Sequence, residues 1–436
     1  MSPSRAFLAF VAAMFALLAL GSPAGADLVA QEDADSGTII RGTLRTAGED
    51  GEDFFVEDVT IVVTDEAGVE VGLAVTDSEG NWMVELPGGG SYSVLLDDST
   101  LPEGVPLRNP ENNPLVVEVR EGASRATLFP LGAAVTSGGN TIQAVQLFVD
   151  GLKLGLIIAM SAIGLSLIYG TTGLTNFAHG EMVTFGALMA FLFHVTGVFG
   201  ITTSLIAATV ISVIIGAVAG GLFNALVWAP LRRRGASLIA ALIVSIGFSI
   251  LLRYLFLYQF GGRSQFYPDY QLQQKYDFGW FTIAPKDLFI ILFSTGILVL
   301  VGLGLQKTRA GKAMRAVADN RDLAESSGID VEQVIRWVWI AGGGLAALGG
   351  VLFGLTEALS WEMGFRVLLL MFAGVTLGGL GSAYGALLGS IIVGIFIQMS
   401  TLVLPSDLKN VGALLTLILI LLVRPQGLLG RAERVG

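Results

Sequence analysis

Apolar runs of about twenty residues recur between residues 147 and 423, and they constrain the fold more than any other feature. Each run is long enough to cross the roughly 30 Å hydrocarbon layer of a membrane as an α-helix. Lipid offers no hydrogen-bond partner, so the backbone must satisfy itself within packed helices. Only 14% of the residues are charged, whereas soluble proteins carry about 25%. The sequence therefore predicts an all-α polytopic membrane bundle.

The alternation of apolar runs and loops predicts about eight to ten transmembrane helices, a range that allows for helices broken by glycine. The nine predicted spans are residues 147–168, 182–200, 203–228, 237–258, 287–305, 337–356, 365–381, 384–403 and 411–423. Together with their loops they form a predicted membrane domain over residues 147–436.

Charge divides the chain into two unlike parts. Residues 27–135 hold 22 Asp and Glu against five Arg and no Lys, a balance of −17. Residues 136–436 hold 14 acidic and 19 basic residues, a balance of +5. An acidic water-soluble domain therefore precedes a membrane domain flanked by basic residues. The chain has no cysteine, which excludes disulfides and cysteine-based metal or redox sites.

Short β-branched runs separated by turn signals predict a small all-β sandwich domain over residues 27–130. Examples are "EDVTIVVTD" and "YSVLLDD", with "DSEGN" and "GGG" between strands. Their order resembles the carboxypeptidase-regulatory or prealbumin-like modules common on extracytoplasmic proteins. Asp77, Glu79 and Asn81 have side chains suited to calcium, but a hairpin turn uses the same residue types and is the favoured interpretation.

The first 26 residues have the features of a secretory signal peptide. Arg5 precedes an apolar stretch, and Ala24-Gly25-Ala26 offers a small-residue cleavage site. The alternative is an uncleaved first membrane helix. A cleaved signal would place the β-domain outside the cytoplasm, with residues 131–146 as the linker to the membrane domain.

Basic residues concentrate in three loops, at residues 232–234, 307–336 and 424–434. By the positive-inside rule these loops are cytoplasmic. Tracing nine crossings back from a cytoplasmic C-terminus places the N-terminus outside, in agreement with the signal peptide. The predicted location is the inner or plasma membrane, with an extracytoplasmic N-terminal domain.

The segment "YGTTGLTNFAHGEM", residues 169–182, is strongly polar although it lies between apolar runs. Polar backbone at membrane depth is tolerated where it is buried in protein or lines a water-filled cavity, and ionisable groups there indicate a pathway. Asn176, His179 and Glu181 are therefore candidate substrate-pathway or gate residues, with Glu181 able to meet an ammonium group. Alternatively, Asn176 and His179 satisfy a helix break and Glu181 lies among lipid headgroups.

The loop at residues 306–336 is predicted to form short helices on the cytoplasmic surface. Asp319 is a candidate cap for a helix over "NRDLAESS", and Gly328 can end that helix in a left-handed turn. Asp330 with Gln333 resembles a capping box for the next helix. A basic loop resting on anionic headgroups is the alternative, but it leaves the caps unexplained. The favoured interpretation is a docking element for a cytoplasmic partner.

Four ordered blocks resemble the branched-chain amino-acid ABC transporter permease family, in particular its H-type inner-membrane subunit. They are "SAIGLSLIYGTTGLTNFAHGEMVTFGAL", "AGKAMRAVADNRDLAESSGID" with the following "GGGLAALGGVLFGL", "FAGVTLGGLGSAYGALLGSIIVGI" and "LVRPQGLLGR". The resemblance spans residues 145–432, and the β-domain departs from it. The pattern D-L-A-x-x-x-G, which begins at Asp322, is similar to the E-A-A-x-x-x-G coupling loop of ABC importer permeases.

The resemblance implies a transport subunit that is not an enzyme and uses no cofactor. Family members pair with a second permease, as a homo- or heterodimer, with cytoplasmic ATPases and with an extracytoplasmic substrate-binding protein. The implied ATPase-coupling residues are Arg315, Asp322, Ala324 and Gly328. No phosphate-binding loop G-x-x-x-x-G-K followed by Ser or Thr occurs, so ATP hydrolysis is expected in a separate chain.

Other interpretations stay open at the level of sequence. Within the same class, related permeases carry urea or short amides, and no residue excludes them. A membrane-anchored sensor or adhesin is the alternative of another class, but it would need only one or two helices. Arg253 and Arg366, near predicted helix ends, are interpreted as extending toward the lipid headgroups. The glycine clusters at 342–344 and 349–350 are expected to let helices pack closely.

Overall fold

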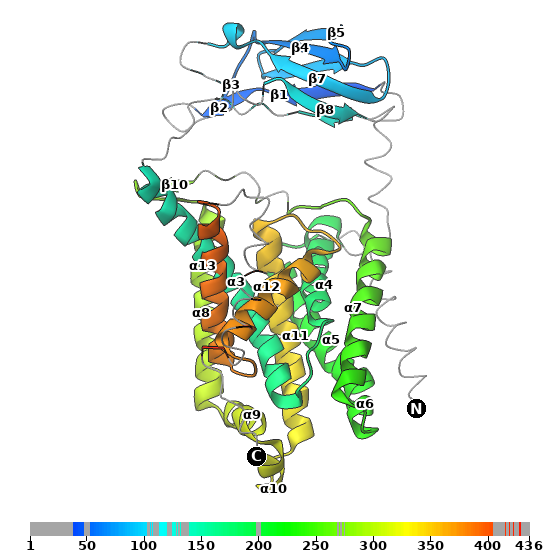
Figure 1. The fold of residues 1–436 in the computed structure, drawn as a ribbon, viewed down its shortest axis with the longest axis vertical. Helices are drawn as coiled ribbons and strands as arrows, with labels where there is room; N and C mark the ends of the chain where they lie inside the picture. Colours follow the sequence, from blue (N-terminus) through cyan, green and yellow to red (C-terminus); the bar gives the residue numbers. More distant parts are fainter. Residues whose placement is uncertain are drawn as a thin grey trace. The chain divides into compact units, whose positions relative to one another are not determined.

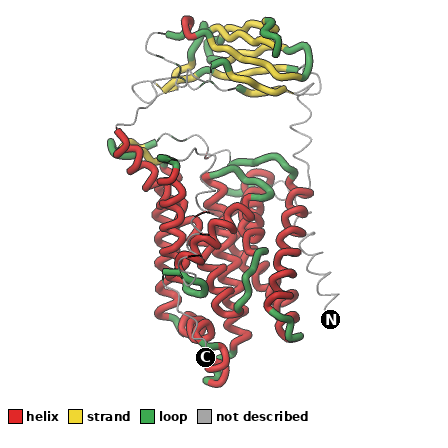
Figure 2. The backbone as a smooth tube through the Cα atoms, in the orientation of Figure 1, coloured by secondary structure: helices red, strands yellow, loops and turns green. Residues whose placement is uncertain are grey.

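The computed structural model describes residues 38–47, 53–102, 105, 107, 113–119, 124–127, 129, 131, 139–197, 202–267, 270, 273, 275–403, 415, 418, 422, 427 and 428. The chain divides into two compact units at the junction of Gly139 and Asn140. Strands build the first unit and helices build the second, apart from one short hairpin (Figures 1 and 2). The predicted signal peptide and most of the predicted helix at 411–423 lie outside the described residues.

The N-terminal unit, here called the β unit, contains two principal sheets. The three-stranded sheet has the order β6-β1-β9, from β1 (Ile39–Thr43), β6 (Asn81–Glu85) and β9 (Ser124–Ala126). The four-stranded sheet has the order β5-β4-β7-β8, from β4 (Thr60–Asp65), β5 (Glu70–Val75), β7 (Gly90–Leu96) and β8 (Leu115–Val119). A hairpin of β2 (Arg45–Ala47) and β3 (Asp53–Phe55) completes the unit.

Alternating side chains from both sheets form one hydrophobic core. Ile61 and Val63 of β4 and Trp82 and Val84 of β6 point into the same cluster, while the residues between them face outward. This alternation is what the period of a half-buried strand requires. The predicted all-β character is confirmed, and the resemblance to prealbumin-like modules stays a prediction.

The "TDSEGN" segment forms a tight turn, as its residue types favour over a calcium site, but it is not a hairpin turn because it joins β5 and β6 of different sheets. One carboxylate oxygen of Asp77 accepts hydrogen bonds from the backbone amides of Glu79 and Asn81, at 2.9 and 2.7 Å. This is the local bonding by which aspartate stabilises a turn. Within the described residues, no cluster of acidic, histidine or cysteine side chains is arranged to hold a metal ion.

The C-terminal unit, here called the membrane unit, is a helical bundle. Its helices are α3 (Gly139–Thr172), α4 (His179–Phe191), α5 (Leu205–Phe223), α6 (Ala229–Arg233), α7 (Leu238–Phe260), α8 (Pro285–Lys307), α9 (Arg309–Asp319), α10 (Arg321–Ser326), α11 (Val331–Thr356), α12 (Met363–Gly378) and α13 (Ala383–Ser400). π-Helical turns extend α4 and join α5 to α6, and the hairpin β10 (Tyr276–Asp277) and β11 (Thr282–Ile283) precedes α8.

Six of the described helices are long and apolar enough to span a membrane: α3, α5 with α6, α7, α8, α11 and α13. Two shorter helices, α4 and α12, account for two more of the predicted spans. The first eight predicted ranges therefore each coincide with a helix, and the multi-pass membrane character is confirmed. The ninth range contributes only a few described residues.

Small residues set the packing at the centre of the bundle, where α5 lies against α11 and α11 against α4. On α5, Ala208, Ser212, Gly216 and Gly220 recur every fourth residue and are buried. A Cβ added to Gly216 would stand 2.5 Å from the Cβ of Ala347 on α11. Such close approach is how helices gain contact in lipid, where the hydrophobic effect does not drive them together.

Candidate functional site

The polar segment between α3 and α4 is a helix break buried inside the membrane unit. Helix α3 ends at Thr172, and Gly173 takes a left-handed conformation with φ of +69°. Residues 173–178 are non-helical, and α4 begins at His179. The side chains of Asn176, His179 and Glu181 are completely buried. The break therefore lies where irregular backbone is tolerated, enclosed by protein.

Hydrogen bonds to α3 and α7 hold this break. The side-chain oxygen of Asn176 accepts from the backbone amide of Ala178 at 3.1 Å, and His179 Nε2 lies 3.0 Å from the backbone oxygen of Ser161 on α3. Ser245 Oγ on α7 accepts from the amide of Phe177 at 3.2 Å. Part of the structural interpretation is thus confirmed, since Asn176 and His179 do satisfy groups around the break.

Glu181 does not lie among headgroups, and that part of the structural interpretation is wrong. Its Oε1 accepts hydrogen bonds from Arg253 Nε at 3.2 Å, from an Arg253 terminal nitrogen at 3.1 Å and from Ser249 Oγ at 3.0 Å. Both partners belong to α7. The interpretation that Arg253 extends toward the lipid headgroups is wrong as well, because its guanidinium turns inward to neutralise a buried carboxylate.

The Glu181–Arg253 pair lies where α4, α7 and α12 meet. The guanidinium carbon of Arg253 lies 4.1 Å from the ring centroid of Phe365 on α12, a cation–π contact. Thr184 Oγ1, one turn beyond Glu181, accepts from the amide of Gly364 at 3.0 Å. A movement of α7 or α12 relative to α4 would therefore disturb the ion pair directly.

Three buried polar atoms at the helix break and in the ion pair have no hydrogen-bond partner. Within the described residues, Asn176 Nδ2, His179 Nδ1 and Glu181 Oε2 are buried without a hydrogen-bond partner. An unsatisfied buried polar atom costs roughly 1–3 kcal/mol, so three around one helix break make this break a candidate functional location. Together the cluster presents a carboxylate, a guanidinium and neutral polar groups inside a membrane bundle. That combination is complementary to both charges of a zwitterion.

The predicted loop at residues 306–336 forms two capped helices, α9 and α10, but one of the predicted caps is wrong. Helix α9 runs through Asp319, so Asp319 does not cap the next helix. Asn320 does, and its Oδ1 accepts from the amide of Leu323 at 2.9 Å. Gly328 has φ of +82°, and Asp330 caps α11 by accepting from the amide of Gln333 at 2.9 Å. The predicted glycine turn and the second cap are thus confirmed.

The predicted coupling residues divide between a buried and an exposed side. Ala324 is buried against the unit, whereas Asp322, Gly328 and Arg315 are exposed. Leu323, which sequence reasoning did not select, is 64% exposed although it is a large apolar residue. Its signal in the sequence was a lone leucine among charged residues of a short helix.

An ion network ties α10 to the bundle. Glu332, in the first turn of α11, lies 3.5 Å from Arg321 of α10 and 2.9 Å from Arg232 of α6. Arg232 also donates to Asn224 Oδ1 at 3.0 Å. One carboxylate therefore joins α10 and α11 to the end of the α5–α6 segment.

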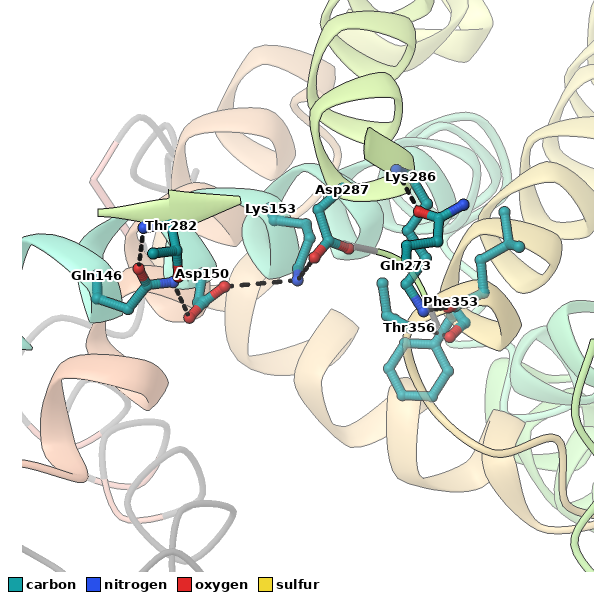
Figure 3. Close-up of polar contacts among 10 residues, drawn as sticks. Gln146, Asp150, Lys153, Gln273, Thr282, Lys286, Asp287, Phe353 and Thr356 are labelled. Atoms are coloured by element: carbon teal, nitrogen blue, oxygen red, sulfur yellow. Dashed lines mark hydrogen bonds and ion pairs between the residues drawn. The ribbon is translucent and has the colours of Figure 1, made fainter. Parts of the chain in front are cut away.

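A second charged network lies where α8 begins, at the end of that helix away from α9 (Figure 3). Lys153 of α3 lies 3.1 Å from Asp287 of α8 and 3.5 Å from Asp150. Lys286 Nζ donates to the backbone oxygen of Leu355, in the last turn of α11, at 3.1 Å. These contacts connect α3, α8 and α11 far from α9 and α10, and sequence reasoning missed them.

Comparisons with known proteins identify the family of the membrane unit. Residues 147–423 match the family model described as the branched-chain amino acid transport system permease component. The high-affinity branched-chain amino acid transport system permease protein BraD of Pseudomonas aeruginosa is 32% identical over 66% of this chain and 96% of its own length. LivH of Escherichia coli, with the same description, is 31% identical over the same shares.

Among solved structures, PsaBC from Streptococcus pneumoniae in complex with Fab aligns with a TM-score of 0.36 and 12% identity, over 64% of this chain and 91% of that one. The match to the family model lies within the membrane unit. The chain belongs to the branched-chain amino acid transport system permease component family.

Proposed function

We propose that the chain is the permease subunit of an ATP-driven importer for branched-chain or related amino acids, with ATP hydrolysed by separate cytoplasmic subunits. The named functions of the relatives support the substrate class. The mechanism is supported mainly by α10, a capped helix whose exposed side is available for a partner to bind. A sensor or adhesin would need one or two helices, and six long apolar helices argue against it.

Energy would enter through α10. Asp322 and Leu323 face outward, while Ala324 in the same turn is buried. A partner that holds the exposed side would therefore displace the buried side with it. The exposed leucine offers such a partner an apolar anchor, the kind of residue that contributes most to binding when an interface buries it. Arg315 on α9 and Gly328 after α10 are exposed as well and would belong to the same partner-binding surface.

The displacement would pass into the bundle through Glu332. This carboxylate holds both Arg321 of α10 and Arg232 of α6, so the coupling helix and the base of the bundle would move as one body. Helix α11 packs along α4 and α5. A push on α10 would thus reach α4, which carries Glu181, and change access from one side of the membrane to the other.

The Glu181–Arg253 pair would act as a gate on the substrate pathway. In the closed pair each charge neutralises the other inside the membrane, where an isolated charge is costly. An amino acid brings an ammonium and a carboxylate, so it can replace each partner in turn without leaving either charge bare. Asn176 and His179 would shape the same passage. Recognition of the apolar side chain would rest mainly with the substrate-binding protein.

The proposed orientation places α9 and α10 in the cytoplasm and the β unit outside. The basic residues of α9 and α10 support it through the positive-inside rule. The proposed partners are ATPase subunits on the cytoplasmic surface, a second permease as homo- or heterodimer, and a substrate-binding protein on the outer surface.

Uptake of radiolabelled leucine tests the proposal. Cells that lack the chain are supplied with the wild type, with Leu323→Asp, or with the matched control Tyr276→Asp, which alters an exposed side chain in the hairpin before α8. The wild type and Tyr276→Asp should restore uptake. Leu323→Asp should reduce it about tenfold or more, because a charge replaces the apolar anchor.

Competition identifies the substrate class. Excess isoleucine or valine should block leucine uptake, and urea should leave it unchanged. Absence of chain-dependent leucine uptake, in cells where no second leucine system masks it, would overturn the branched-chain assignment. Uptake of labelled urea that depends on the chain would then assign it to urea or short amides. Equal transport by Leu323→Asp and wild type would overturn the role of α10.

A further inference from the structure

The β unit contains a groove of about 1000 Å³ between the edges of its two sheets. Strand β5 ends the four-stranded sheet and β6 ends the three-stranded sheet, so neither has a second strand partner among the described strands. Residues of both strands line the groove, together with β1, the end of β3 and Thr127. Edge strands present unpaired backbone groups and accept added strands readily.

Three large apolar side chains are exposed in this groove. Phe55 is 53% exposed, Val75 is 50% exposed and Met83 is 57% exposed, and all three line it. Single exposed apolar residues are ordinary, but several gathered in one concave place mark a binding surface. The sequence alternation did not predict this, because these residues occupy outward-facing strand positions.

Two buried polar atoms of the groove lining are unpartnered. Trp82 Nε1 and Thr127 Oγ1 have no hydrogen-bond partner within the part of the chain that the structure describes. Both residues are more than nine-tenths buried, and both line the groove. Burying a donor without an acceptor is unfavourable.

Acidic residues outnumber basic ones around the groove. Of the charged residues that line it, Asp77 is acidic and Arg41 is basic. Within two positions of a lining residue stand the acidic Asp53, Glu57, Glu79 and Glu85 and the basic Arg45 and Arg125. With a balance of −17 over residues 27–135, two copies of the unit would repel each other at such an interface. A cationic occupant is favoured instead.

We propose that this groove binds an extended peptide segment of a partner protein, with apolar and basic side chains in alternation. The backbone of the segment would run along the β5 and β6 edges, in the manner of strand addition. Its apolar side chains would cover Phe55, Val75 and Met83. Its basic side chains would face the acidic rim. The proposal does not depend on the transported substrate.

Fluorescence anisotropy on the full chain in lipid nanodiscs tests it. The probe is a fluorescein-labelled ten-residue peptide of alternating valine and lysine. Wild type should bind it, and the same peptide with glutamate for lysine should bind at least about tenfold more weakly. The double variant Phe55→Ala with Met83→Ala should weaken binding of the lysine peptide about tenfold. Both substitutions are at exposed positions, so the fold should persist.

Val116→Ala is the matched control, because Val116 is an exposed residue of β8 at the opposite edge of the four-stranded sheet. It should bind like the wild type. Equal weakening by Val116→Ala and by the double variant would overturn the assignment to this groove. Equal affinity for the glutamate peptide would overturn the charge argument. Absence of peptide binding, with saturable binding of cellohexaose instead, would assign the groove to carbohydrate.

Discussion

The two units have apolar interiors but present different faces to their surroundings. In the β unit, Ile61 and Val63 are buried while charged residues such as Glu85 face outward. In the membrane unit the outward face is apolar as well, as at Ile214 on α5, and the completely buried Glu181 is a charged exception within an apolar core. Each unit places toward its surroundings the groups that those surroundings solvate. The same degree of exposure therefore has opposite energetic meaning in the two units.

The largest expected effect comes from breaking the buried ion pair. Arg253→Ala leaves the Glu181 carboxylate buried without its main partner, which should cost about 3–5 kcal/mol of stability. The control is Arg366→Ala, because its pair with Glu362 is roughly half exposed and spans 3.8 Å. Exposed pairs contribute about 0–1 kcal/mol. Thermal unfolding of the purified variants in detergent compares the two losses.

If Arg253→Ala and Arg366→Ala lose similar amounts of stability, burial of the Glu181 carboxylate is not what makes Arg253 important. The double variant Glu181→Gln with Arg253→Gln separates structure from transport. It removes both charges, so it should recover much of the stability lost by Arg253→Ala. If the pair is a gate, leucine uptake should stay low in the double variant despite that recovery.

The second prediction compares an exposed apolar residue of each unit. Ile214→Lys places a charge on the outward face of α5, where Ile214 is 58% exposed, and Val116→Lys does the same on β8, where Val116 is 74% exposed. A lysine at the centre of a membrane helix costs about 2.5–3.5 kcal/mol. A lysine in water at a strand surface should change stability by less than about 0.5 kcal/mol. The yield of folded protein after membrane extraction measures both.

The sequence predicted the helices well because length and hydropathy are local properties. It placed the start of α4 three residues late, since His179 and Glu181 look like loop residues when polarity is taken as exposure. In fact both are buried in the helix. The alternation of the strands likewise predicted the β core, but it could not distinguish a solvated surface from a groove that exposes Phe55 and Met83.

The ion pair lay beyond sequence reasoning for a different reason. Glu181 and Arg253 are 72 positions apart, and no local pattern specifies which helices of a bundle face each other. The predicted N-cap of α10 was wrong by one residue, because Asp and Asn cap helices about equally well. Only the extent of α9, which continues through Asp319, decides that Asn320 is the cap.

The third prediction concerns small residues at the helix contacts. A Cβ on Gly216 would stand 2.5 Å from Ala347 Cβ and 3.0 Å from the backbone oxygen of Gly343, whereas a Cβ on Gly296 of α8 would meet nothing within 4 Å. Gly216→Ala should therefore destabilise the unit by about 1–3 kcal/mol. Gly296→Ala should be neutral or stabilising by up to about 1 kcal/mol, since alanine favours the helix.

Thermal unfolding distinguishes Gly216→Ala from Gly296→Ala, because the first should lower the unfolding temperature and the second should leave it unchanged or raise it. A loss of stability in Gly296→Ala equal to that in Gly216→Ala would show that glycine matters for flexibility rather than for close packing.

The smallest stability effect is expected at Gly328, where the functional effect should be large. Its φ of +82° favours glycine, so Gly328→Ala should cost about 1 kcal/mol from backbone strain. Gly235 has φ of +67° in the loop after α6, and a Cβ there, as at Gly328, would meet nothing within 4 Å. Gly235→Ala should therefore cost a similar amount. Matched unfolding temperatures would establish that the two variants are equally strained.

Transport then isolates coupling from stability. Gly328 follows α10 and fixes how that helix meets α11, so its substitution should lower leucine uptake per folded molecule and weaken stimulation of the partner ATPase. Gly235 is outside the α9–α10 surface, and Gly235→Ala should transport like the wild type. Equal uptake by the two variants would mean that strain, and not the position of α10, limits transport, and the role of the turn in coupling would be lost.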